Sequence, residues 1–243
     1  MAGWHERRLA AFDVETTGVD PERDRIVTAA VSLVGGGRPS EHHAWLLDPG
    51  VEIPAEATAV HGVTTERARA EGRPAAAAIE EIVTVLAEQA RWGVPVVAFN
   101  ARFDLTTLDR EALRHGVRPL VDRVGAAAGD LLVVDPYVID KHVDRFRKGK
   151  RTLAAVCEHY RVPLDEAHAA GEDAIAAARI AWRMGRVYPE LGAMELPELH
   201  ERQVAWAAEQ AASLEQWLRS EGRPQRCEPA WPIVPRPADA LAA

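Results

Sequence analysis

The apolar positions of this chain change their spacing after Pro54, and this change constrains the fold more than any other feature. Before Pro54 they form three short runs typical of β-strands, at residues 9–14, 25–34 and 41–47, and glycines 35–37 predict a hairpin between the last two. Beyond Pro54 the spacing is mainly helical, interrupted by strand-like runs at 94–99 and 130–135. This order predicts an α/β fold in which helices flank a mixed five-stranded sheet.

Five helices are expected between and after these strands, at residues 65–70, 74–91, 103–115, 152–160 and 171–184. A longer amphipathic helix is expected at 195–220; its apolar stripe is predicted to pack on the same chain, with a partner-docking face as the alternative. From residue 222 prolines predict an extended tail, which Trp231 is expected to anchor. We therefore divide the chain into a domain at 1–190, a helix at 191–221 and a proline-rich tail at 222–243.

The charge and composition exclude several classes of protein. A net charge of −8 argues against a protein that coats nucleic acid through a broad basic face. The apolar runs are too short to cross a bilayer and the N-terminus has no signal-peptide core, so we expect a cytoplasmic protein without a membrane partner. Cations nevertheless gather in one segment, which predicts either a solvated loop or a guide for a nucleic-acid strand. They are Lys141, Arg145, Arg147, Lys148, Lys150 and Arg151.

Two carboxylates stand at the end of the first expected strand. Asp13 and Glu15 are two residues apart, so both side chains point to the same face of the sheet. Carboxylates held this close repel each other unless a cation lies between them, and oxygen ligands suit Mg²⁺ or Mn²⁺. The turn that follows, Thr16-Thr17-Gly18, has backbone amides that can approach a sugar or a phosphate.

Further polar groups follow at two helix starts. Asp104 opens the helix after the strand at 94–99, and Asn100 is expected to cap that helix or to orient Asp104. Phe103 suits either stacking on a base or packing in the core. Asp173 lies in the first turn of the helix at 171–184, and His168 precedes it on a loop, where a histidine can deprotonate water. Four carboxylates and one histidine are the groups needed to hydrolyse a phosphodiester with two divalent ions.

These segments resemble the motifs of the DEDDh group of 3′–5′ exonucleases, over roughly residues 8–188. Asp13 with Glu15 matches the first motif, Asp104 in Asn-x-x-Phe-Asp the second, and His168 with Asp173 the third. The resemblance implies a ribonuclease H-like fold and two Mg²⁺ or Mn²⁺ ions: Asp13 would bridge both, Glu15 and Asp173 would complete one, and Asp104 would support the other. His168 would be the general base.

The same resemblance extends to substrate contacts. Residues 59–64 are similar to a family segment whose histidine, here His61, contacts the nucleotide, and Glu56 stands where epsilon-like members carry a substrate-contacting glutamate. We expect Thr16, Thr17, Gly18, Glu56, His61, Asn100 and Phe103 to contact substrate.

The predicted activity is removal of nucleoside 5′-monophosphates from the 3′ end of DNA. An exoribonuclease of the same fold is the close alternative, because no residue clearly indicates recognition of a 2′-hydroxyl. A docking subunit for a polymerase or repair partner is the alternative from another class. The pattern leaves strand preference, processivity, oligomeric state and the role of the C-terminal helix and tail open.

Overall fold

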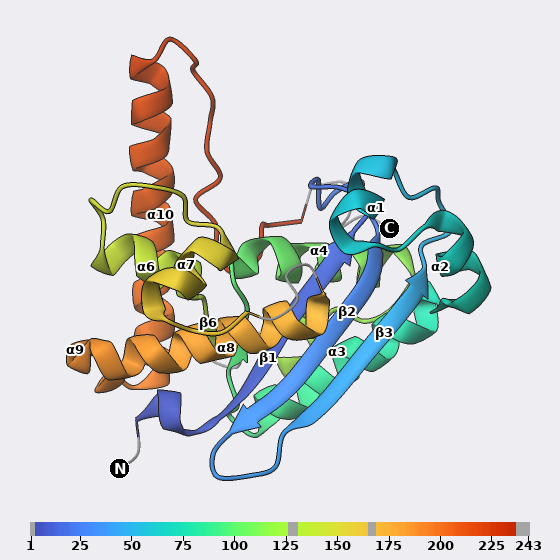
Figure 1. Cartoon of the computed structure of the whole chain (residues 1–243), viewed down its shortest axis with the longest axis horizontal. Coiled ribbons are helices and arrows are strands. Elements are labelled where there is room, and N and C mark those ends of the chain that lie inside the picture. Colours follow the sequence, from blue (N-terminus) through green and yellow to red (C-terminus); the bar gives the residue numbers. More distant parts are fainter. Residues whose placement is uncertain (1–2, 126–130, 165–168, 237–243) are drawn as a thin grey trace.

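The central sheet contains six strands in the order β4-β3-β2-β1-β5-β6. The computed structural model describes residues 3–125, 131–164 and 169–236 (Figure 1). Strands β1 (Arg8–Thr16), β2 (Ile26–Gly35) and β3 (Glu41–Asp48) are antiparallel, and β5 (Val96–Val97) and β6 (Val133–Val134) continue the sheet in parallel beyond β1.

The expected α/β class is confirmed, and the sheet has one strand more than expected. The additional strand, β4 (Arg73–Pro74), pairs in parallel with the end of β3. It consists of an arginine and a proline, so no run of apolar residues marks it as a strand. Strands β5 and β6 have only two paired residues each, although the apolar runs that predict them are longer.

Helices cover both faces of the sheet. Helix α8 (Ala170–Val187) crosses the face seen in Figure 1, and α3 (Ala75–Arg91) and α4 (Ala101–Arg114) lie behind it. The apolar side of α3 buries Ile79, Ile82 and Leu86 completely. Helix α8 instead buries a series of alanines, whose small side chains let a helix approach a sheet closely.

Short helices connect these layers. They are η1 (Trp4–Glu6), α1 (Ala55–His61), α2 (Thr65–Glu71), α5 (Leu120–Val124), α6 (Pro136–Val143), α7 (Leu153–Tyr160) and α9 (Pro189–Gly192). Of these, only α2 and α7 were expected; η1, α1, α5, α6 and α9 were not. Helix α1 buries no residue, and α6 begins at the capping residue Asp135, whose side chain accepts from the N–H of Tyr137.

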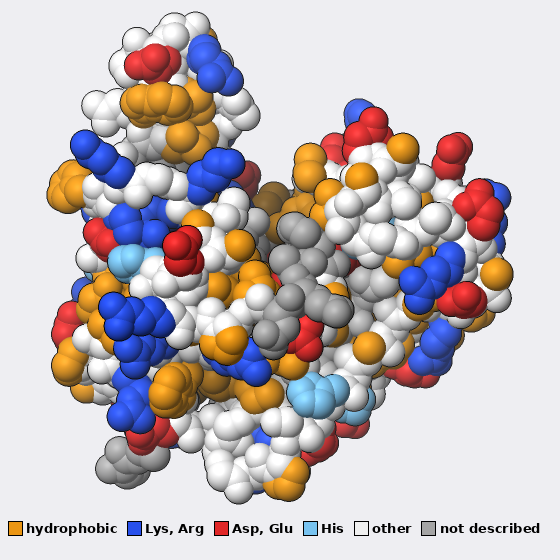
Figure 2. Space-filling view, in the orientation of Figure 1, with side chains coloured by type: hydrophobic (Ala, Val, Ile, Leu, Met, Phe, Trp, Pro, Cys, Tyr) orange, Lys and Arg blue, Asp and Glu red, His pale blue; other side chains and the backbone are white. Residues whose placement is uncertain are grey.

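The first half of helix α10 (Leu196–Ser220) packs against β6 and α6, whereas its far end projects from the molecule (Figures 1 and 2). Gln203 is fully buried and bonds to the backbone of Val133 and Asp135, and His200 accepts from the N–H of Val133. These bonds satisfy the open edge of β6. The apolar stripe of α10 thus packs on the same chain over its first half; in the second half Leu218 is buried, whereas Leu214 and Trp217 remain exposed.

The segment after α10 returns along this helix and then lies across α4 (Figure 1). Trp231 is 6% exposed and, as expected, anchors the tail. The N–H of Val234 donates to the hydroxyl of Thr106, and Arg110 donates to the carbonyls of Val234 and Pro235. The tail is therefore extended but attached to α4, the helix whose first turn contains Asp104. Among the described helices, none is both long and apolar enough to cross a membrane.

Candidate active site

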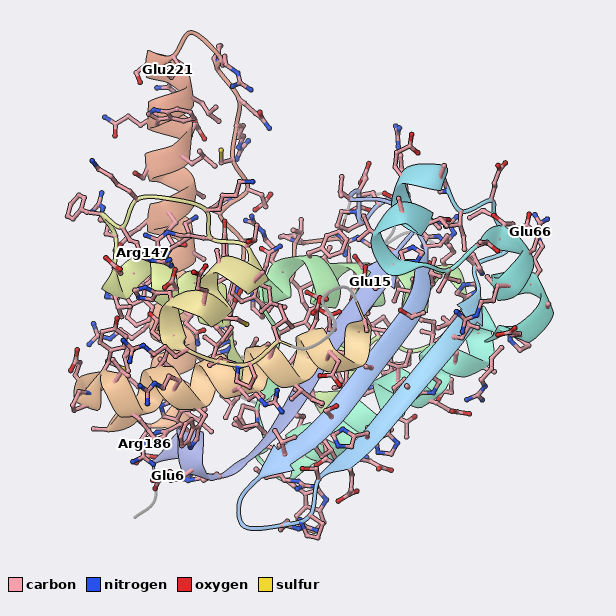
Figure 3. All side chains as sticks on the ribbon, viewed as in Figure 1. Glu6, Glu15, Glu66, Arg147, Arg186 and Glu221 are labelled. Carbon is pink, nitrogen blue, oxygen red and sulfur yellow. The ribbon has the colours of Figure 1, made fainter. Side chains whose placement is uncertain are left out.

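Three carboxylates meet at the end of β1. Asp13 and Glu15 point to one face of the strand while Val14 between them is buried on the other, as the alternation of a strand requires. Asp173 faces them from the first turn of α8, and ligand oxygens of the three side chains lie within 4.8 Å of one another. Figure 3 shows Glu15 where β1 passes beside the start of α8. The predicted proximity of these three carboxylates is therefore present in the structure.

Asp104 reaches the same strand from α4. Its Oδ1 accepts a hydrogen bond of 3.1 Å from the N–H of Val14, and the side chain is buried. This N–H is available because the ladder between β1 and β5 includes only Ala10 and Ala11. The hydrogen bond places the fourth carboxylate next to Asp13, between the two residues of the first motif.

Burial and mutual repulsion raise the pKa values of these groups. The pKa of Asp13 is well above its ordinary value, mainly through burial and then through the nearby Asp104, Asp173 and Glu15. Burial, followed by the charge of Asp173, raises the pKa of Glu15 to about 7. The pKa of Asp104 is also raised, because burial outweighs the bond from Val14. Bound divalent cations would relieve this repulsion, and a donor set made only of carboxylate oxygens fits Mg²⁺ or Mn²⁺.

Comparison with known proteins agrees with this geometry. The model of the RNase_T exonuclease family matches residues 10–181, a segment that includes all four carboxylates. The chain belongs to this exonuclease family. The resemblance to the DEDDh group is thereby confirmed.

Several curated relatives and solved structures are similar to parts of this chain. A DNA polymerase III subunit epsilon-like protein of Rhodobacter capsulatus is 40% identical over 137 residues, which are 51% of this chain and 19% of that protein. A PolC-type DNA polymerase III of Streptococcus agalactiae is 27% identical over 178 residues, 72% of this chain and 11% of the relative. The chain thus spans less than a fifth of these relatives.

Among solved structures, E. coli exonuclease I in complex with a dT13 oligonucleotide has a TM-score of 0.62 at 19% identity, over 76% of this chain and 43% of that one. Exonuclease I of Methylocaldum szegediense has a TM-score of 0.59 at 22% identity, over 76% and 41%. These two likenesses show the fold.

The turn after β1 is held by its own side chains. The hydroxyl of Thr16 donates to the carbonyl of Gly18, and that of Thr17 donates to Asp24 and accepts from the N–H of Arg25. A Cβ on Gly18 would lie 2.5 Å from a carboxylate oxygen of Asp24, so only glycine fits there without a shift. The two hydroxyls hold the turn, and the expectation that they contact substrate stays a prediction.

Helix α1 lies beside this turn (Figure 1). His61 at its end is half-buried next to the backbone of Thr16, and its Nδ1 accepts from the N–H of Val63. Burial lowers the pKa of His61, so the ring is neutral at pH 7. Glu56, on the first turn of α1, is exposed. The structure therefore brings His61 to the end of β1 and leaves Glu56 on the surface.

The start of α4 is held by a residue that the sequence motifs did not indicate. Asn100 has a left-handed backbone (φ 65°) and its side chain makes no capping bond, so its expected capping role is wrong. Instead, the carboxylate of Asp135 accepts from the N–H groups of Asn100 and Ala101, each at 2.9 Å. An aspartate directly before Pro136 is typical of a helix N-cap and signals the start of α6, but no sequence signal indicates that it also holds the start of α4. Phe103 is partly buried against the core, which supports the packing alternative for its ring.

The predicted base, His168, lies outside the described residues. Described residues resume at Ala169, whose carbonyl accepts from the N–H of Asp173 and so begins α8.

Proposed function

We propose that this exonuclease removes nucleotides one at a time from the 3′ end of DNA and releases nucleoside 5′-monophosphates. The observation that supports this is the convergence of Asp13, Glu15 and Asp173 within 4.8 Å, with Asp104 bonded to the strand between the first two. Four carboxylates from three separate elements, with raised pKa values, form a site suited to divalent cations.

In this proposal, Asp13, Glu15 and Asp173 would hold one divalent ion, and Asp13 and Asp104 would hold a second. Two such ions would supply positive charge for the activation of water and for the leaving 3′ oxygen. His168 accepts the proton of the attacking water. His61 and the backbone of the turn at residues 16–18 position the terminal nucleotide, together with Glu56, Asn100 and Phe103.

DNA is the favoured substrate because the names of the similar proteins refer to DNA polymerase III and to an oligonucleotide of thymidine nucleotides. The 40% identical relative is named as a polymerase III epsilon-like protein, and the similar exonuclease I is bound to a DNA oligonucleotide. Cleavage of RNA by the same site is the alternative. We also propose a polymerase or repair partner; this stays a proposal because the chain spans only a small part of its polymerase relatives. A cytoplasmic location is a further part of the proposal.

Matched DNA and RNA oligonucleotides of one sequence, labelled at the 5′ end, test the proposal in Mg²⁺ or Mn²⁺. We expect a ladder that shortens from the 3′ end, mononucleotide products, a faster rate on DNA, and no reaction with a 3′-blocked control. Asp13→Asn is expected to abolish cleavage, whereas Glu88→Gln, on the exposed side of α3, is expected to keep it. Degradation from the 5′ end or full activity of Asp13→Asn would refute the assignment, and a faster rate on RNA would replace DNA as substrate.

A further inference from the structure

A groove of about 670 Å³ lies between α6 with the segment that follows it and the projecting half of α10. Lys141, Arg145 and Phe146 line one wall, and Leu214 and Trp217 line the other. The groove is outside the carboxylate site.

Aromatic rings are exposed on both walls. Phe146 is 88% exposed and Trp217 is 52% exposed, although rings of this size are usually buried. An exposed ring offers a flat face on which any nucleic-acid base can stack, without regard to sequence. Two such rings on opposite walls are suited to a single strand whose bases are unpaired.

The cations of this segment fall into two groups. Arg147 and Arg151 both bond to the fully buried carboxylate of Asp140, and Arg151 also donates to the carbonyl of Asp144. These bonds hold the segment after α6 in place (Figure 3 labels Arg147 there).

The second group consists of Arg145, Lys148 and Lys150. No carboxylate among the described residues forms an ion pair with them, and all three are exposed. Figure 2 shows Lys and Arg side chains gathered on this side of the molecule. Glu209 also lines the groove, on the α10 wall, so a bound polyanion is expected to follow the α6 wall. The segment is thus a fixed platform with cations available for phosphates.

A row of side-chain contacts leads from the groove toward the start of α4, the helix that carries Asp104. Lys141 at the groove lies 4.8 Å from the centre of the Tyr137 ring, and Tyr137 packs edge-on against Phe99 with 5.6 Å between ring centres. Phe99 lies two residues after the end of β5 and one residue before Asn100. Arg102, in the turn of α4 that carries Asp104, lies close enough to lower the pKa of Lys141, after burial and Arg151. Positive charge therefore continues from the start of α4 to the groove.

We infer that this groove binds the single strand of the substrate on the 5′ side of the bond to be cleaved. Bases stack on Phe146 and Trp217, and phosphates contact Arg145, Lys148 and Lys150. This inference rests on the proposed function. It deepens that function because it gives the enzyme, besides the carboxylate site, a second region of contact with the substrate that only longer strands reach. A strand is favoured over an acidic peptide because the row of rings and cations leads toward the start of α4, which carries Asp104.

Binding of 5′-fluorescein dT oligonucleotides of 4, 8 and 16 nucleotides, measured by anisotropy in EDTA, tests the inference without turnover. The pair Phe146→Ala and Trp217→Ala is expected to raise the Kd of the 16-mer at least about fivefold, and to affect the 4-mer less. The triple variant Arg145→Ser, Lys148→Ser, Lys150→Ser is expected to reduce the slope of log Kd against log salt by about 2.

The matched control is Trp92→Ala with Arg91→Ser at the end of α3, where Trp92 is 84% exposed. It is expected to bind like the wild type. An unchanged 16-mer Kd and salt slope in the groove variants, or an equal loss in the control, would overturn the inference. The inference would also be overturned if a labelled acidic, apolar peptide bound in the groove and the groove variants left the Kd of the 16-mer unchanged.

Turnover separates this inference from the proposed function. In Mg²⁺ the groove variants are expected to raise KM more for the 16-mer than for the 4-mer. If the wild type cleaves neither oligonucleotide, the proposed function fails, while the anisotropy series still decides whether the groove binds a strand.

Discussion

Replacing Trp231 with phenylalanine tests whether the C-terminal tail secures the helix that carries Asp104. The indole Nε1 donates to Oδ2 of Asp135 at 3.2 Å, and the same carboxylate holds the first two N–H groups of the α4 start. A phenylalanine keeps most of the ring, which packs 5.2 Å from the ring centre of His200, and loses the N–H donor.

The expected loss of stability follows from these contacts. A buried hydrogen bond to a charged group contributes about 1.5–3 kcal/mol, and the missing part of the ring leaves a small cavity that costs about 1 kcal/mol. We therefore expect the free energy of unfolding at pH 8 to fall by about 2.5–4 kcal/mol. For a chain of this size, each kcal/mol lowers Tm by about 2–4 °C.

The loss is expected to depend on pH. Burial raises the pKa of Asp135 from its ordinary 3.8 to about 6, and the bond from Trp231 opposes that rise. A carboxyl group with a raised pKa favours the folded state when protonated, so the wild type loses about 3 kcal/mol from this group as pH rises from 4 to 6. Without the indole donor the pKa of Asp135 rises further, so the variant continues to lose stability above pH 6, where the loss in the wild type has ended.

Urea unfolding followed by far-UV circular dichroism at pH 5 and pH 8 measures both effects. Trp92→Phe, at an exposed position, is the control and is expected to change stability by less than about 0.5 kcal/mol. A loss for Trp231→Phe below about 0.5 kcal/mol, or an equal loss at the two pH values, would refute the role given to the tail.

Three further predictions concern the site and the backbone. In metal-free protein, Glu15→Gln is expected to increase stability at pH 8 by about 1–2 kcal/mol after allowance for solvent screening. The reason is that the raised pKa of Glu15, near 7, makes the wild type lose stability between pH 4.5 and 7. Urea unfolding should show no such gain at pH 4, and an equal gain there would contradict this cause. Added Mg²⁺ is expected to raise the Tm of the wild type at pH 8 more than that of Glu15→Gln, and equal shifts in a thermal scan would argue against Glu15 as a ligand. Gly72→Ala is expected to lower stability by about 1–3 kcal/mol, since its Cβ would lie 2.5 Å from the amide nitrogen of Asp48. Gly171→Ala, in the first turn of α8, should raise stability by up to about 1 kcal/mol, because its Cβ would meet no atom of the described residues within 4 Å; the reverse order would contradict the packing.

Much of the site could be predicted because its geometry is local. Asp13 and Glu15 share a face because side chains alternate along any strand, and Asp173 belongs to the first turn of a helix whose start is visible in the pattern. The α/β class followed in the same way from the change in apolar spacing. The additional strand β4 could not be predicted, since two residues without an apolar run acquire strand geometry only from their neighbour β3.

The amino-acid sequence by itself thus determined which side chains can act together, through periodicities of two and of 3.6 residues. Only the tertiary structure decided how Asp104 meets Val14 across ninety positions, how Asp135 rather than Asn100 holds the start of α4, and how Trp231 brings the tail onto that carboxylate. Each of these contacts joins the side chain of one segment to a polar group of a distant one. Such bonds depend on which backbone N–H groups the sheet leaves unpaired, and no local pattern of residues records that.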